Sequence, residues 1–143
     1  MTPTGAGYLL VRAGGRRVGL ALAQVVEVLD AGPMYPVPTV EPAVRGVTSL
    51  RGRIVPLIHL GALLEGTGCP EIRSEVAIVV QVGGRTLCLE VEEAETVLKE
   101  PGLPVPPGTA LAWAVAVART ENGLVPLLDL TALGGRLKEN PAA

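Results

Sequence analysis

Two stretches of the chain are near copies of one another, and they decide its fold. Residues 9–22 read LLVRAGGRRVGLAL and residues 78–91 read IVVQVGGRTLCLEV, so a glycine pair interrupts an apolar run in both. The pairs Gly14-Gly15 and Gly83-Gly84 lie 69 positions apart, close to half of the 143-residue chain. Glycine pairs between apolar runs are typical of tight β-hairpins, because glycine readily adopts the positive φ that such turns need. Each half is therefore predicted to begin with a hairpin.

The repeat continues beyond the hairpins. Residues 52–60 read GRIVPLIHL and residues 123–130 read GLVPLLDL, with Pro56 and Pro126 lying 70 positions apart. A proline-rich stretch, 33–42 in one half and 101–107 in the other, precedes each of these segments and predicts an extended connection rather than a central strand. Two similar β-units in one chain imply a seam or cleft between them, and neither unit contains a catalytic motif. This organisation indicates a protein that holds other proteins.

The composition favours an all-β chain packed by aliphatic side chains. Hydrophobic residues make up 48% of the chain although it has no Phe, one Trp and two Tyr, and its apolar runs are broken by 18 Gly and 13 Pro. Short, β-branched runs of this kind predict many short strands joined by turns. Strands are expected at 8–12, 17–22, 25–29, 43–49, 54–60, 75–82, 85–91, 92–98, 111–119 and 124–130.

About five short strands per half, with no long helix, favour small closed barrels, because an open sheet would leave long apolar edges free to aggregate. We therefore predict two pseudo-repeated, five-stranded SH3-like barrels packed together. The first is expected at 8–66 and the second at 74–137, joined by a linker over 65–74 and followed by a flexible tail at 138–143. Short helical turns are expected at 23–24 and 61–64, and residues 92–98 are expected to match the helical turn and strand of the first half.

Charge and motif content argue against several functional classes. The net charge of −2 gives no electrostatic case for binding nucleic acid or an anionic membrane. The longest clearly apolar stretch, 111–118, is far shorter than the roughly 20 residues needed to cross a bilayer, and residues 1–7 lack a signal-peptide pattern, so a cytoplasmic protein is expected.

No chemistry for an enzyme or a cofactor is visible in the chain. His59 is the one histidine, and Cys69 and Cys88 lack the spacing of a metal or redox motif and are expected to be buried or partly buried thiols. Motifs such as HExxH, GxSxG and the P-loop are absent. The acidic cluster at 92–95 is expected to be a solvated face. An enzyme or small-molecule-binding barrel is therefore the least favoured class, and turnover or tight ligand binding by the purified chain would be its sign.

Residues 46–60, GVTSLRGRIVPLIHL, closely resemble the signature of the CheW family of bacterial chemosensory scaffolds. Residues 19–28, GLALAQVVEV, are also similar to the family's G-I-x-I-x-x-V-x-E-I segment. The resemblance covers roughly residues 8–135 and is more specific in the first half. It implies a single CheW-like domain of two SH3-like barrels, in agreement with the repeat. It also implies a non-catalytic adaptor between the cytoplasmic tips of chemoreceptors and the regulatory domain of a CheA-type histidine kinase, which shares the fold.

The resemblance also supplies candidate interface residues. Carried over position by position, they are Val25, Glu27 and the neighbouring Val28 from the first segment, Gly46 at the start of the signature, and Arg51, Gly52 and Arg53 at its hairpin tip. Each has a purely structural alternative. The tip arginine would then be a solvated turn residue, the glutamate the outward position of an edge strand, the two valines ordinary core, and the glycine a relief of backbone crowding.

Two positions depart from the family pattern. Where the family usually has I-V-D-L-R, this chain has His59 and Gly61, so a carboxylate and a long cation are both replaced. The histidine is expected to be a local hydrogen-bonding residue rather than a pH sensor. The departures motivate an alternative function, a CheW-like regulator that kept one of the receptor or kinase interfaces and tunes the array without bridging it. Trp113, isolated in a chain with few aromatic residues, is expected to pack in the seam or, if exposed, to act as a binding hot spot.

Overall fold

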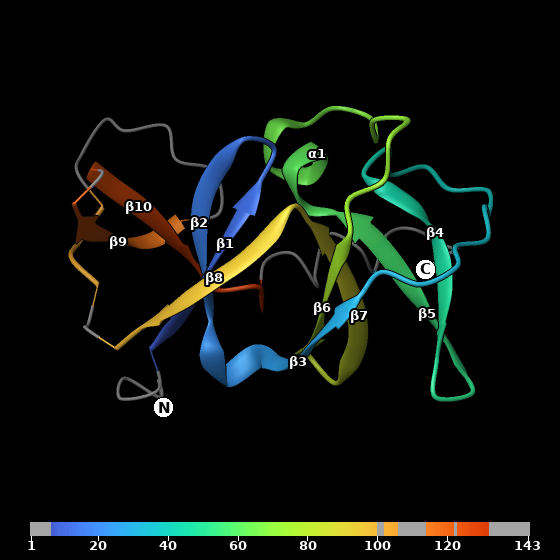
Figure 1. Cartoon of the computed structure of the whole chain (residues 1–143), viewed down its shortest axis with the longest axis horizontal. Coiled ribbons are helices and arrows are strands. Elements are labelled where there is room, and N and C mark those ends of the chain that lie inside the picture. The colour runs from blue at the N-terminus through green and yellow to red at the C-terminus, as the bar shows by residue number, and fades with distance from the viewer. Residues whose placement is uncertain (1–6, 100–101, 106–113, 122, 132–143) are drawn as a thin grey trace.

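The structure, a computed structural model, describes residues 7–99, 102–105, 114–121 and 123–131. These residues form ten strands, one α-helix and one 3-10 turn (Figure 1). The strands are β1 (Tyr8–Ala13), β2 (Arg16–Ala21), β3 (Val25–Asp30), β4 (Val44–Leu50), β5 (Arg53–His59), β6 (Val76–Val82), β7 (Arg85–Val91), β8 (Glu93–Leu98), β9 (Ala114–Thr120) and β10 (Gly123–Leu128). The 3-10 turn is η1 (Leu22–Gln24) and the helix is α1 (Leu60–Glu65). The nearly all-β architecture confirms the predicted fold class.

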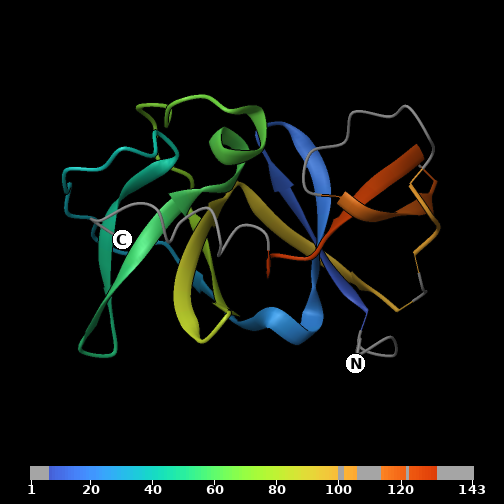
Figure 2. The same ribbon diagram turned by 180° about the vertical axis from the view of Figure 1, so that it is seen from behind.

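The strands form two five-stranded sheets of identical plan. The sheet of lobe A has the order β8-β1-β2-β10-β9, and the sheet of lobe B has the order β3-β6-β7-β5-β4. Replacing each strand of lobe A by its repeat in the other half of the sequence reproduces the order of lobe B. The one parallel contact in each sheet is also equivalent, β2 with β10 in lobe A and β7 with β5 in lobe B. The lobes lie side by side, and the view from behind shows the same division (Figures 1 and 2).

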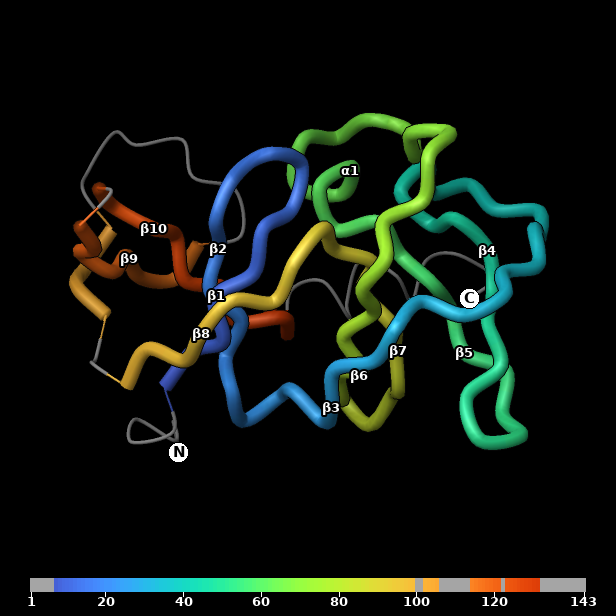
Figure 3. The backbone as a smooth tube through the Cα atoms, viewed as in Figure 1, coloured from blue at the N-terminus to red at the C-terminus, as the bar shows by residue number. Residues whose placement is uncertain are grey.

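The two lobes do not coincide with the two halves of the sequence. The β1–β2 hairpin joins the sheet formed by strands of the second half, and the β6–β7 hairpin joins the sheet formed by strands of the first. Lobe B is therefore a continuous segment, 25–91, inserted between the two segments 8–21 and 93–128 of lobe A. The course of the chain from one lobe to the other and back can be followed in Figure 3. The segments 8–66 and 74–137 expected for the barrels thus each contribute to both sheets. A sequence repeat predicts which residues of each half form strands. It does not predict whether a hairpin pairs with strands of its own half or of the other half.

Each sheet is tied across its two outer edges by one short bridge. Tyr35, which follows β3, exchanges two backbone hydrogen bonds of 2.9 Å with Val47 on β4. Leu103, which follows β8, does the same with Val117 on β9, at 2.7 and 2.9 Å. The bridges occupy equivalent places in the repeat and draw the edges of each sheet toward one another.

The main hydrophobic core lies between the lobes. It combines Leu9, Val11, Val18, Leu20 and Leu128 of lobe A with Ile58, Ile78, Val80, Leu87 and Leu89 of lobe B, among others. A smaller cluster inside lobe B consists of Val55, Leu57, Val79 and Cys88. Because the larger cluster is shared, burial of apolar surface holds the lobes to each other as well as holding each together.

The predicted local elements are largely confirmed. The glycine pair of the first hairpin has φ values of 64° and 78°, and that of the second has 58° and 81°, as tight two-residue turns require. The helical turn expected at 61–64 is α1, and that at 23–24 is η1. The expected helical turn of the second half is absent, since Glu92 is a bend and β8 starts at Glu93. Trp113 and the tail lie outside the described residues.

Among the described residues, no helix is both long and apolar enough to cross a membrane.

Candidate protein-docking surface

The outer edge of lobe B presents an apolar strand face. Strand β3 has β6 as its one neighbour in the sheet, and its burial alternates from residue to residue. Val26 and Val28 are 53% and 45% exposed, whereas Val25, Glu27 and Leu29 are half-buried. The pairing with β6 shifts register between Val25 and Glu27, which marks Val26 as a bulged residue. Bulges of this kind are common on edge strands, where they limit pairing with other sheets.

The turn between β4 and β5 is joined to this edge by an ion pair. Arg51 Nη2 donates a 2.7 Å hydrogen bond to Glu27 Oε1, and its Nη1 also contacts Glu27 Oε2. The hydrogen bond from Arg51 holds the pKa of Glu27 below its ordinary value, and burial opposes this shift only in part. The same bond raises the pKa of Arg51. We refer to the exposed valines of β3, the ion pair of Glu27 with Arg51, and residues 51–54 at the turn and the start of β5 as the docking edge.

The turn has an unusual backbone at Arg51. Its φ is 49°, and Gly52 follows with φ 81°, the arrangement of a tight hairpin turn with two left-handed residues. Arg51 is the one non-glycine residue with positive φ in the described part of the chain. An arginine in this conformation carries a small conformational cost, which the bidentate contact to Glu27 offsets. Arg53 and the apolar Ile54 extend the exposed surface of the turn.

Gly46 lies behind the docking edge and is buried. A Cβ atom at this position would come within 2.4 Å of the Tyr35 carbonyl oxygen and 2.8 Å of Met34 Sδ. Glycine is therefore needed for the segment after β3 to approach β4 and form its bridge. Gly46 thus fits the purely structural alternative, in which the glycine relieves backbone crowding.

The structure brings five of the seven candidate residues to the docking edge and leaves two behind it. The five are Glu27, Val28, Arg51, Gly52 and Arg53. Val25 is half-buried on the inner side of β3, and Gly46 is buried. Sequence reasoning missed Val26 and Ile54. Strand alternation would have assigned Val26 correctly had Val25 been taken as inward-facing, whereas nothing in the sequence marks Ile54.

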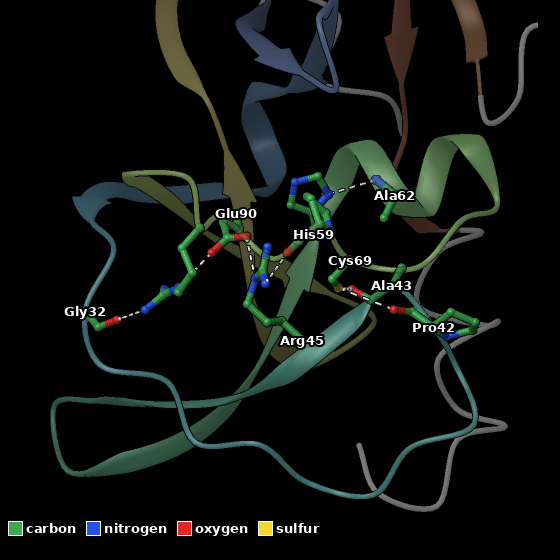
Figure 4. A network of polar contacts seen from close by, with 10 residues as sticks. Gly32, Pro42, Ala43, Arg45, His59, Ala62, Cys69 and Glu90 are labelled. Atoms are coloured by element: carbon green, nitrogen blue, oxygen red, sulfur yellow. Dashed lines mark hydrogen bonds and ion pairs between the residues drawn. The ribbon is translucent and has the colours of Figure 1, made fainter.

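A second polar group lies inside lobe B, close to the seam (Figure 4). Glu90 on β7 is fully buried, and its two carboxylate oxygens accept hydrogen bonds from Arg45 Nε at 2.7 Å and Arg73 Nε at 3.0 Å. The Arg45 side chain is only 7% exposed. The Nη2 atoms of both arginines are buried without a hydrogen-bond partner among the described residues. The cluster thus holds two guanidinium groups and one carboxylate, and it depends on Glu90 for its neutralisation.

The departures from the family pattern have local explanations. His59 precedes α1, and its Nδ1 accepts a 2.9 Å hydrogen bond from the Ala62 amide, which caps the helix. Asp129, at the equivalent position of the second half, accepts the Thr131 amide at 2.9 Å. His59 therefore accepts the capping hydrogen bond that a carboxylate would otherwise accept. A Cβ on Gly61 would lie 2.7 Å from the Gly14 amide nitrogen, so a side chain there would displace the β1–β2 turn.

Burial disfavours the charged forms of the histidine and of both cysteines. His59 is 7% exposed, and its burial lowers its pKa, which favours the neutral ring. Burial likewise raises the pKa of the Cys69 and Cys88 thiols, which favours their protonated forms. A cavity of about 370 Å³ at the seam is lined by His59, Arg73 and the first glycine turn, among others. Within the described ranges, no group of three or more His, Cys, Asp or Glu residues is placed to hold a metal ion.

Comparisons with known proteins agree with this geometry. The family described as the CheW-like domain matches residues 7–138 of the chain. The chemotaxis protein CheW of Klebsiella aerogenes is 28% identical over 130 residues, which cover 91% of this chain and 74% of that protein. The crystal structure of the scaffolding protein TtCheW from Thermoanaerobacter tengcongensis superposes with a TM-score of 0.74 at 23% identity, covering 89% of this chain and 92% of that one.

Proposed function

This chain belongs to the family of CheW-like domains, and on that premise we propose that it is a non-catalytic adaptor. It would couple the cytoplasmic tips of chemoreceptors to the regulatory domain of a CheA-type histidine kinase in a chemosensory or motility pathway. The observation that carries the proposal is the docking edge, an exposed apolar strand face beside an ion pair between the exposed Arg51 and the half-buried Glu27.

The chemistry of the docking edge suits a helical receptor tip. Such tips are four-helix bundles that carry apolar side chains, and Val26 and Val28 offer an aliphatic surface to receive them. Glu27 lies between these valines in sequence but on the less exposed face of β3, and its pair with Arg51 would form a polar rim. In such an arrangement apolar contacts give affinity and charges give orientation. The five candidate residues at the docking edge would therefore act together.

Two lobes of one plan suit a bridging role. The regulatory domain of a CheA-type kinase has the same fold, as the family resemblance implies, so adaptor and kinase would pair through similar surfaces. By holding receptor and kinase at once, the adaptor would let receptor conformation bias the population of active kinase. The alternative of a regulator with one lost interface was motivated by His59 and Gly61, and both have capping or packing roles away from the docking edge.

Binding measurements on single-site variants test the adaptor proposal. Val28→Asp places a charge on the docking edge and is expected to weaken binding to a receptor cytoplasmic fragment by about tenfold or more, as for a residue at the centre of an interface. Val115→Asp is the matched control, since Val115 is similarly exposed on the edge strand β9 of lobe A. Wild-type protein should co-sediment with both the receptor fragment and the kinase. Binding to neither would refute the adaptor, and binding to one alone would favour the regulator.

A further inference from the structure

One buried carboxylate ties the docking edge to the interior of lobe B. Beyond their bonds to Glu90, each arginine of the cluster holds a backbone carbonyl outside the sheet. Arg45 Nη1 donates to the Pro70 oxygen at 2.8 Å, and Arg73 Nη1 donates to the Gly32 oxygen at 2.7 Å. Glu90 is therefore connected to the segment after α1 and to the segment after β3 (Figure 4).

The segment 66–75, which we call the strap, overlaps the linker expected at 65–74 but is anchored to the rest of lobe B at several points. Cys69 Sγ lies 3.3 Å from the carbonyl oxygens of both Pro42 and Ala43, and the strap carries Arg73 into the cluster. Its last residue, Glu75, accepts the Ala31 amide at 2.8 Å. These contacts join the strap to β3, to the segment before β4 and to the Glu90 cluster.

The strap in turn fixes the end of β3. Two hydrogen bonds connect them directly after the strand, from the Ala31 amide to Glu75 and from Arg73 to Gly32. At the start of β3, the Gln24 side chain bonds Asp129 and the Leu130 amide of lobe A. The strand that exposes Val26 and Val28 is therefore held at both ends, and Arg73 supplies the side-chain contact at the second.

We propose that Arg73, oriented by Glu90, is a positioning residue for the docking edge, although neither side chain lies on that edge. This inference rests on the proposed adaptor function. Arg73 has the donor geometry for the task, because a planar guanidinium bonds a carboxylate and a carbonyl at once, whereas a lysine ammonium on a flexible stem does not hold both in fixed directions. Substitution by lysine therefore keeps the positive charge of Arg73 but removes its hydrogen bond to the Gly32 oxygen.

The test compares Arg73→Lys and Arg73→Gln by backbone amide hydrogen exchange. Both variants lose the hydrogen bond from Arg73 to the Gly32 oxygen, which lies next to the Ala31 amide in the chain. Exchange at the Ala31 amide is therefore expected to rise about tenfold, which corresponds to the loss of one charge-assisted hydrogen bond. Exchange at Leu89, in the middle of the β6–β7 pair, should stay as in the wild type for Arg73→Lys, which keeps a cation beside Glu90. Unchanged exchange at Ala31, or an equal rise at both amides in Arg73→Lys, would overturn the proposal.

Receptor binding supplies the second measurement. Affinity for a receptor fragment is expected to fall about tenfold in Arg73→Lys, with the melting temperature close to that of the wild type. Arg12→Gln is the matched control, because Arg12 pairs with Glu95 on β8, the counterpart of β3 in lobe A, and its loss should leave receptor affinity unchanged. Wild-type affinity in Arg73→Lys would overturn the positioning role. A wild-type protein that binds no receptor refutes the adaptor instead, and the exchange measurement then decides whether the hydrogen bond from Arg73 to the Gly32 oxygen holds the end of β3.

Discussion

At the scale of single residues, His59 shows how a change of chemistry is absorbed without a change of role. Its Nδ1 caps α1, as Asp129 accepts the Thr131 amide in the other half of the repeat. The imidazole acts as an acceptor only when Nδ1 carries no proton, so the cap requires the neutral ring. Its buried position favours that form and lowers its pKa below the ordinary value of 6.5.

The pH dependence of stability follows from this arrangement. Because the pKa of His59 is lower in the folded than in the unfolded chain, the unfolded chain binds more protons below the ordinary value. The contribution of the neutral ring is therefore complete above about pH 6.5 and is lost as pH falls toward the lowered pKa. His59→Asn keeps a capping acceptor that does not titrate. The free energy of unfolding, measured with urea at several pH values between 5 and 8, should rise with pH more steeply in the wild type than in this variant.

His59→Ala serves as the control for the cap itself. It removes the acceptor at every pH and is expected to cost about 1 kcal/mol in the free energy of unfolding. Equal pH slopes in the wild type and His59→Asn would mean that the histidine does not contribute through its neutral form.

At the scale of elements, the contact between α1 and the β1–β2 turn depends on the absence of a side chain at Gly61. Gly61→Ala is expected to destabilise the protein by about 1–3 kcal/mol, because the added methyl group meets the backbone of Gly14 at under 3 Å. Gly68→Ala is the matched control, since a Cβ there meets nothing within 4 Å. Chemical denaturation of the two variants gives the comparison. An equal effect at both positions would contradict close packing of the helix against the turn.

The elements that the sequence predicts best are those specified by short-range chemistry. The glycine turns, the tip at Arg51 and Gly52, and the short helix are all encoded by residues within a few positions of one another. The family signature supplied five residues that lie together at the proposed docking edge, but not the bulge at Val26, because a bulge depends on how β3 pairs with β6. The buried pairing of Glu90 with Arg45 and Arg73 was also missed, since these residues are distant in sequence and their charges resemble ordinary surface charges.

At the scale of the whole molecule, the repeat predicted two similar β-units but not their exchange of hairpins. A testable consequence concerns a cut in the strap near Gly68. Both sheets contain strands from each side of this point, so a protein cleaved there should remain a single particle on gel filtration and separate only in denaturant. A protease site inserted next to Gly68 allows the measurement. Separation of the two pieces under native conditions would contradict the exchanged pairing.

The shortness of the two crossings between the lobes has a mechanical meaning. The chain passes from lobe A to lobe B through η1 and returns through the single residue Glu92, while a common core fills the space between the sheets. Short crossings and a large apolar contact leave little freedom for a hinge. The two lobes should then move together as one rigid body, so that a force applied to one lobe rotates the whole protein and does not bend it between the lobes.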